Sequence, residues 1–168
     1  MNNHDVIDRM MLRWGEILPE LDGDAMHLVG RIIILAQHLE RSVESALSLH
    51  GMTLGQFDIL ATLRRAGPQS PKQLMQNVML TSGGMTNRLD RLQHAGWVER
   101  TQDPNDRRAL IVRLTAAGQE LIDVATKTRF ADAENSLPAW DPATKTSLAE
   151  MLRQWLSHLE AQGKAEKS

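Results

Sequence analysis

The chain has no cysteine among its 168 residues, and no apolar run in it approaches membrane-spanning length. Without cysteine, disulfides, thiol redox sensing and cysteine-ligated zinc are excluded. The first fourteen residues carry several charged side chains and contain no apolar core of signal-peptide length. These absences lead us to expect a cytoplasmic protein with no membrane partner.

Signatures of catalysis are missing as well. The sequence has no glycine-rich phosphate loop, no nucleophile elbow and no paired-carboxylate motif. Its six histidines are scattered, with no pair at the spacing of metal ligands. We therefore expect a protein that is not an enzyme and that needs no metal or other cofactor.

Charge is present but unevenly placed. Residues 64–113 contain nine arginines and lysines and four acidic residues, a net charge of +5, whereas the whole chain carries −2 and the remainder therefore −7. A local basic region in an acidic protein is typical of sequence-selective DNA binding, because the overall repulsion limits non-specific binding.

The basic region contains the pattern of a helix-turn-helix. Ser70 can cap a helix that has Pro71 at its first position, and Gln73 stands where a capping box needs it. After a turn, Thr81 or Ser82 is expected to begin a second helix, which we call the recognition helix. This helix is the candidate for entry into the major groove of DNA.

The recognition helix has one apolar and one polar face at about 100° per residue, and Gly96 follows where a glycine ends a helix. The predicted inner face consists of Met85, Leu89 and Leu92. The predicted outer face consists of Gly83, Asn87, Asp90 and His94, flanked by Thr86 and Arg91. Such a small, polar outer face suits contact with a duplex.

Two short segments with strand composition follow, at residues 97–100 and 109–113. The residues between them, from Asp103 to Arg108, are rich in turn formers. A hairpin here would project Arg107 and Arg108 beside the recognition helix. The sequence therefore predicts a winged helix-turn-helix, a mostly α fold with a small β-wing.

Further helices are expected at about 5–18, 24–49, 53–66, 115–130 and 142–159. Thr53, Thr115 and Asp141 are the predicted caps of three of them. The terminal helices have more apolar surface than one DNA-binding module can cover, so we expect them to form a homodimer. The predicted domains are 1–50, with the N-terminal and dimerisation helices; 51–115, the DNA-binding lobe; 116–162, the C-terminal dimerisation helices; and 163–168, a disordered tail.

These segments resemble the MarR family of multiple-antibiotic-resistance regulators. The resemblance rests on the run TSGGMTNRLDRLQHAGWVER, on the wing segment DPNDRRALIVRLT and on the AAG that follows it. It extends over nearly the whole chain and implies a dimeric transcriptional regulator, expected to act as a repressor. Such a dimer binds double-stranded DNA at two half-sites about one helical turn apart.

The residues expected to contact bases or phosphates are Thr86, Asn87 and Arg91. Ser82 is expected to contact the DNA backbone, and the amide region of Gly83 to approach a phosphate. By resemblance, Arg107 at the wing tip enters the minor groove, where narrow A·T-rich tracts attract arginine. Arg108 either contacts DNA beside it or pairs with Asp106 and so fixes the turn.

A narrower resemblance concerns the segments RWGEILPELD, GQFDILATLRRAGP and MTNRLDRL. They are similar to the urate-responsive branch of the family, of the PecS and HucR type, although the loop at residues 68–70 is a few residues shorter than is usual there. In that branch a tryptophan, an aspartate and an arginine at these positions line a ligand pocket. By resemblance, the ligand-binding residues are Trp14, Asp58 and Arg88, with Arg100 in the wing strand as a fourth member.

The chemistry of these residues suits a small aromatic anion such as urate. Arg88 can pair with delocalised negative charge through its planar fork, and Trp14 offers a ring face and an N–H donor. Because Arg88 belongs to the recognition helix, binding of the anion would move that helix and weaken DNA binding.

Simpler interpretations of the same residues remain open. Arg88 would then hold the helix against the body of the protein, Trp14 would be a packing anchor and Asp58 a surface acid. The same fold would then respond to a phenolic or lipophilic effector. A third alternative is a winged helix used only for protein–protein contact, which predicts DNA binding that is weak and insensitive to sequence.

Overall fold

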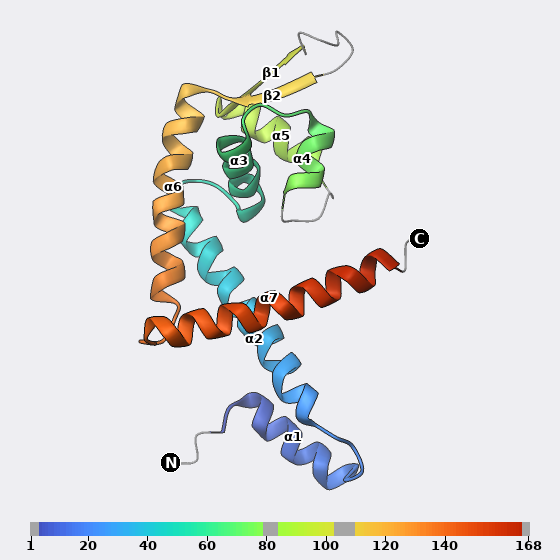
Figure 1. Ribbon diagram of the computed structural model, residues 1–168. Coiled ribbons are helices and arrows are strands. Elements are labelled where there is room, and N and C mark those ends of the chain that lie inside the picture. Colours follow the sequence, from blue (N-terminus) through green and yellow to red (C-terminus); the bar gives the residue numbers. More distant parts are fainter. Residues whose placement is uncertain (1–3, 79–83, 103–109, 166–168) are drawn as a thin grey trace. The chain divides into compact units, whose positions relative to one another are not determined.

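The computed structural model describes residues 4–78, 84–102 and 110–165 (Figure 1). The element order is α1 (Val6–Ile17), α2 (Asp24–Ser48), α3 (Leu54–Ala66), α4 (Pro71–Asn77), α5 (Met85–His94), β1 (Val98–Gln102), β2 (Leu110–Leu114), α6 (Ala116–Asn135) and α7 (Pro142–Ala165). The chain divides into two compact units, Met1–Asp132 and Ala133–Ser168. The expected fold, mostly helical with a two-stranded antiparallel wing, is confirmed.

Side-chain caps begin the helices where the sequence predicts them. Before α3, the backbone N–H of Thr53 donates to Gln56 Oε1 at 2.9 Å, and the Thr53 hydroxyl accepts the N–H of Gln56. Ser70 and Gln73 form the same capping box before α4. At the start of α7, the Asp141 carboxylate accepts a backbone N–H at 2.9 Å. Each such cap stabilises its helix by roughly 0.5–2 kcal/mol.

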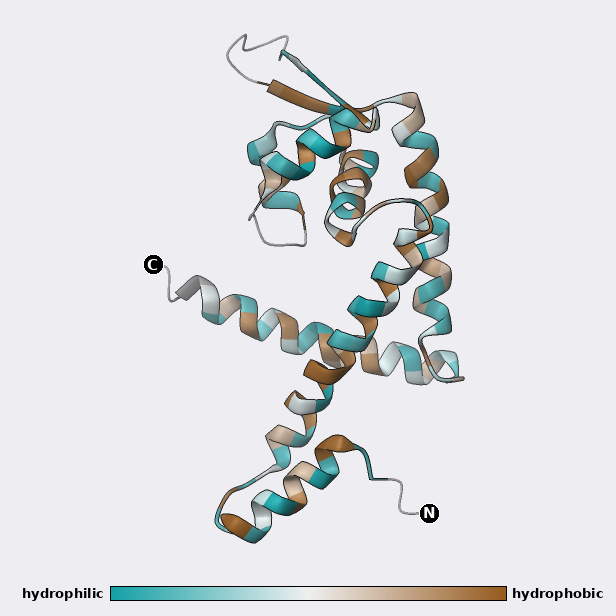
Figure 2. Ribbon diagram, turned by 180° about the vertical axis from the view of Figure 1, so that it is seen from behind, coloured by the Kyte–Doolittle hydropathy of each residue, from teal (hydrophilic) through white to brown (hydrophobic). Residues whose placement is uncertain are grey.

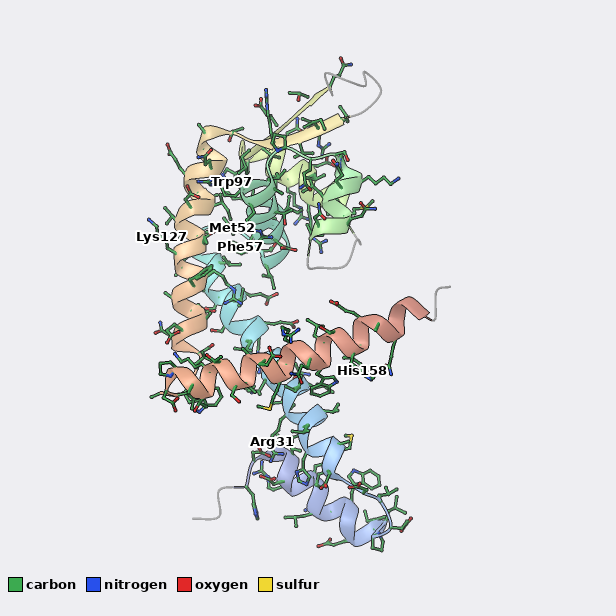
Figure 3. The ribbon with its side chains drawn as sticks, viewed as in Figure 1. Arg31, Met52, Phe57, Trp97, Lys127 and His158 are labelled. Carbon is green, nitrogen blue, oxygen red and sulfur yellow. The ribbon has the colours of Figure 1, made fainter. Side chains whose placement is uncertain are left out.

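The hydrophobic core of the first unit lies among α3, α4, α5 and the wing, with further side chains from α2 and α6. The buried face of α5 is the predicted one, formed by Met85, Leu89 and Leu92. Of the three core-region residues labelled in Figure 3, Met52 belongs to this core, and Phe57 and Trp97 pack against it. The recognition helix is therefore fixed by burial of its inner face.

The wing consists of β1 and β2, paired antiparallel with Arg100 opposite Val112. A third segment joins it, because Gln69 exchanges two backbone hydrogen bonds with Val112, at 3.0 and 2.8 Å. The sequence gives no sign of this bridge, which ties the loop before α4 to the base of the wing.

The start of α6 packs against the segment that leads into the wing. The Thr115 hydroxyl accepts the N–H of Gly118 at 3.0 Å and donates to the carbonyl of Gly96 at 2.7 Å, so Thr115 caps α6 as predicted. Gly118 lies so close to the backbone of Trp97 that an added Cβ would collide with its carbonyl oxygen. The glycine of the AAG motif is therefore required by close approach of two backbone segments.

Polar contacts join α6 to the two helices beside it. The hydroxyl of Ser42 in α2 donates to Asp132 at 2.5 Å. Arg64 in α3 donates two hydrogen bonds to Asp123, at 2.8 and 3.3 Å. The Arg64 guanidinium lowers the pKa of the Asp123 carboxyl from its ordinary value.

The N-terminal helix α1 is docked on α2. Arg31 of α2, labelled in Figure 3, donates to Asp5 at 2.8 Å and to Asp8 at 2.6 Å. Ile7 is buried, with its side chain against Gly30 of α2. Hydrogen bonding to Arg31 is the main reason that the pKa of Asp8 is lowered.

Two helix ends differ from the prediction. The recognition helix begins at Met85 and not at Thr81 or Ser82, because Gly84 precedes it in the left-handed conformation with φ of +79°; residues 79–83 lie outside the described residues. The last helix continues to Ala165, so the first residues of the expected tail are helical. Lys164 and Ala165 favour helix, and they continue α7 past Gly163.

The long helices carry apolar residues that this chain does not bury. In Figure 2, brown apolar positions recur along α2 and α7. The large exposed apolar side chains of α2 are Met26, Leu28, Ile32, Ile33, Leu35, Leu39, and those of α7 are Met151, Leu152, Leu156 and Leu159. Among the helices in the described ranges, none has the length and apolar character needed to cross a membrane.

Candidate nucleic-acid interface

The outward face of α5 is polar. Its exposed residues are Thr86, Asn87, Asp90, Arg91 and His94. Because α5 packs on α3 and β1, this face is presented by a fixed element. Its side chains are of the types that contact base edges and phosphates. The other predicted DNA contacts, Ser82, Gly83, Arg107 and Arg108, lie outside the described residues.

One residue on this face is joined to the wing. Arg100 of β1 donates to Asp90 Oδ1 at 2.6 Å. The Arg100 side chain is 22% exposed, and its buried Nε has no hydrogen-bond acceptor within the part of the chain that the structure describes. An ion pair with one exposed partner contributes roughly 0.2–1 kcal/mol. Its geometric effect is that β1 and α5 are held in one relative position.

A hollow of about 510 Å³ lies between the recognition helix, α2 and the start of α3; we call it the α5 hollow. Gly84, Asn87, Arg88 and Arg91 line it from α5, Glu40 and Glu44 from α2, and residues 53–56 from the start of α3. One wall therefore carries two guanidinium groups and another carries two carboxylates. Two of the lining residues, Asn87 and Arg91, also belong to the outward face of α5.

Arg88 is oriented toward the body of the protein, as predicted. It is half-buried, and a Cβ added at Gly55 would lie 2.8 Å from its Nε. Asp58, one turn further along α3, is only 6% exposed. The interpretation of Asp58 as a surface acid is therefore wrong, because its turn of α3 faces the core.

Trp14 lies in a different place. It is 47% exposed and lines a hollow of about 940 Å³ between α1 and the start of α2, which we call the α1–α2 hollow. Of the four predicted ligand residues, only Arg88 lines the α5 hollow, since Asp58 is buried in α3 and Arg100 is paired with Asp90. Within one chain the structure does not bring Trp14 to Arg88.

Sequence reasoning did not single out Glu40 and Glu44. Their spacing of four residues places them on one face of α2, but charges on a long helix are ordinarily solvated, so the spacing alone gives no functional signal. They do not form a metal site, because the described residues contain no group of three histidine, aspartate or glutamate side chains that could hold an ion.

Comparison with known proteins agrees with this geometry. Residues 52–110 match the sequence profile of the MarR family. The HTH-type transcriptional regulator PecS of Dickeya dadantii is 30% identical over 156 residues, which cover 91% of this chain and 94% of PecS.

Solved structures show the same likeness. A mutant form of MarR from Escherichia coli, complexed with operator DNA, matches with a TM-score of 0.68 and 28% identity over 85% of this chain and 97% of that one. A MarR-like transcription regulator from Bacillus cereus matches with a TM-score of 0.74 and 22% identity over 82% and 99% of the two chains. The protein belongs to the MarR family and is a winged helix-turn-helix, DNA-binding transcriptional regulator, not an enzyme.

Proposed function

We propose that the protein is a homodimeric repressor that binds a pseudo-palindromic operator and is released from it by a small aromatic anion such as urate. One observation carries the proposal: Arg88 and Arg91 of the recognition helix both line the α5 hollow. A ligand in this hollow therefore contacts the same helix that is to contact DNA.

The exposed apolar faces support the dimer. Most of the large apolar residues of α7, and those of the first half of α2, are exposed in the single chain. Contiguous apolar surface of this kind marks an interaction site, and a two-fold pair of identical chains is its commonest partner. Two recognition helices related by a two-fold axis then read half-sites about one helical turn apart.

The proposed DNA contacts divide by type. Thr86, Asn87 and Arg91 contact base edges or phosphates, and their exposure on α5 supports this assignment. Ser82 and Gly83 at the approach to α5, and Arg107 and Arg108 at the wing tip, enter the proposal through the family resemblance and their residue types.

The two walls of the α5 hollow define the class of effector. Arg88 and Arg91 attract a planar anion, whereas Glu40 and Glu44 repel bare negative charge and accept N–H donors. Urate carries a delocalised negative charge and several N–H groups on one planar ring system. Salicylate carries the charge without N–H donors, so this hollow favours urate.

Release follows from linkage between the two ligands. If the anion binds more tightly to an arrangement in which Arg88 and Arg91 turn into the hollow, it lowers DNA affinity by that difference and by no more. Asp58 follows two residues after Gln56, which lines the hollow, and it is buried. Its carboxylate opposes an approaching anion. Arg100 acts through its pair with Asp90, which joins the wing to the same helix.

Trp14 enters the effector site only through the family resemblance, because within one chain it lines the α1–α2 hollow. The substitution Trp14→Ala therefore tests the resemblance separately from Arg88→Ala.

The proposal is tested by an electrophoretic shift assay with the upstream DNA of the gene at fixed physiological salt, titrated with urate and then with salicylate. We expect release at a lower concentration of urate than of salicylate. Arg88→Ala should abolish the response to urate and retain DNA binding. Arg65→Ala, which removes an exposed arginine of α3 outside the hollow, is the matched control and should respond like the wild type.

The substitution Glu44→Gln sharpens the assay. It removes a charge that repels anions and leaves a weaker acceptor for N–H groups, so it should narrow the difference between urate and salicylate. Specific DNA binding with no response to urate would transfer the effector assignment to phenolic or lipophilic compounds. Loss of DNA binding in Arg88→Ala would show that Arg88 serves the interface itself.

A further inference from the structure

Three residues form a row across the base of the wing. Arg100 of β1 is paired with Val112 of β2, which is paired in turn with Gln69 in the segment before α4. Side chains at directly paired positions of a sheet lie on the same face. Val112 is fully buried in the core of the DNA-binding lobe, so Gln69 and Arg100 are directed toward the core side of the wing. We call these three residues the wing-base row.

The two ends of the wing-base row reach the two helices of the helix-turn-helix. Gln69 is only 8% exposed, and its Oε1 accepts a hydrogen bond from Nδ2 of Asn77, the last residue of α4, at 3.1 Å. At the other end, Arg100 is paired with Asp90 of α5. The row therefore joins the base of the wing to α4 as well as to the recognition helix.

The amide of Gln69 is not needed to fill its position. An apolar side chain beside Val112 would be buried without the cost of dehydrating a polar group, whereas a buried amide must be hydrogen-bonded. What the amide adds is direction, because its oxygen accepts the Asn77 donor from one side only. The backbone of Gln69 is itself fixed by its two hydrogen bonds to Val112. The bond to Asn77 therefore holds the end of α4 in one position relative to β2.

Asn77 lies where this constraint affects the recognition helix. It ends α4, eight positions after Gln69, so the hydrogen bond spans the length of that helix. Leu74 of α4 and the inner face of α5 belong to the same core. Because α4 and α5 share that core, a shift of α4 against the wing also shifts the recognition helix against the wing.

We propose that Gln69 and Asn77 are positioning residues for DNA binding, which hold the helix-turn-helix in a fixed position relative to the wing. Their hydrogen bond allows α5 to contact the major groove and the wing to contact the minor groove at the same time. The proposal rests on the proposed function, since it takes Arg107 at the wing tip to contact the minor groove. Without the bond, the lobe keeps its core, but the wing and the recognition helix no longer fit one operator together.

The test measures discrimination between DNA sequences by the full-length protein. Hydroxyl-radical footprints of the wild type and of Arg107→Ala on the upstream DNA locate the base pairs under the wing, and methylation protection locates those under α5. Fluorescence anisotropy at fixed salt then gives two ratios of Kd. The wing ratio compares the operator with a duplex whose base pairs under the wing are exchanged between A·T and G·C. The helix ratio compares the operator with a duplex changed at one base pair under α5.

We expect Asn77→Ala and Gln69→Leu each to lower the wing ratio by about three- to tenfold, since a changed base pair at a contacted position costs about 5- to 150-fold in affinity. The helix ratio should stay at its wild-type value. Asn77 is exposed, so its substitution leaves the core intact. The double variant should lose no more than either single variant, because both substitutions remove the same bond.

Gln119→Ala, which removes an exposed amide of α6, is the matched control and should keep both ratios. Circular dichroism checks that all variants are folded at the assay temperature. A purely structural role would reduce the fraction of active protein and weaken binding to all three duplexes by one factor. Unchanged ratios in Asn77→Ala and Gln69→Leu would therefore overturn the proposal, as would an equal fall of both ratios. If Arg107→Ala also leaves the wing ratio unchanged, the wing contact of the proposed function and this proposal fail together.

Discussion

The DNA-binding lobe, residues 51–115, and the long helix α7 use their apolar residues in opposite ways. In the lobe, the leucines of the recognition helix are buried, and Leu92 is fully inaccessible. In α7, Leu156 is 59% exposed, and no residue with a described side chain is buried. The lobe therefore builds a core from its own sequence, whereas the apolar face of α7 needs a second surface.

The largest effect on stability should come from truncating a leucine in the lobe, and a leucine of α7 serves as the comparison. Leu92→Ala leaves a cavity in the core of the lobe and should lower the free energy of unfolding by about 2–5 kcal/mol. Leu156→Ala should cost little at low protein concentration, but it should weaken self-association. Urea unfolding measures the first effect and sedimentation equilibrium the second. If Leu156→Ala changes neither quantity, α7 is not the dimer surface.

The next effect concerns one glycine in each region. Gly118→Ala places a methyl group against the Trp97 carbonyl and should lower the free energy of unfolding by about 1–3 kcal/mol or more. Gly163→Ala in α7 meets no atom within 4 Å and should stabilise its helix by about 0.5–1 kcal/mol. Thermal unfolding of both variants measures the contrast. Equal shifts of the same sign would contradict the close approach at Gly118.

The sequence predicts what local chemistry decides. The caps at Thr53 and Ser70 follow from residue types three positions apart, and burial of Leu92 follows from helical spacing. The start of the recognition helix at Met85 does not follow in this way, because it is set by the left-handed conformation of Gly84.

Contacts between distant segments were not predictable. The bridge between Gln69 and Val112 depends on backbone groups 43 positions apart, which any residue type supplies equally well. The position of Glu44 in the lining of the α5 hollow, and the burial of Asp58, likewise depend on how α2, α3 and α5 pack. The α5 hollow is therefore predictable only through the family resemblance. Glu40 and Glu44, which form its acidic wall, are not predictable from the sequence.

A smaller effect tests a predicted cap of the lobe. Thr53→Ala removes the hydroxyl that accepts the Gln56 N–H and should lower the free energy of unfolding by about 0.5–2 kcal/mol. Thr53→Ser keeps the hydroxyl and is the matched control. Chemical denaturation measures both variants, and an equal loss in the two would show that the methyl group, not the cap, stabilises α3.

The smallest effect concerns α1, which is held by ion pairs as well as by one buried isoleucine. The pKa of Asp8 is lowered below its ordinary value of 3.8, first by hydrogen bonding to Arg31. The stabilisation is therefore present above pH 3.8 and is lost as the pH falls through the lowered value.

Acid titration of the Trp14 fluorescence, taken as the difference between wild type and Trp14→Leu, should show α1 undocking in this range. Arg31→Met should lose the transition, because α1 is then loosened at all pH values. A transition that persists in Arg31→Met would assign it to another carboxylate.

The pair of Asp90 and Arg100 also limits how operator preference can change during evolution. Drift at Thr86 or Asn87 alters only the outward face of α5, so single substitutions there are free to retune base preference. A change at Asp90 leaves the half-buried guanidinium of Arg100 without its carboxylate and so perturbs the wing at the same time. Position 90 is therefore expected to vary only together with position 100, and an engineer who wishes to recode the operator should leave both unchanged.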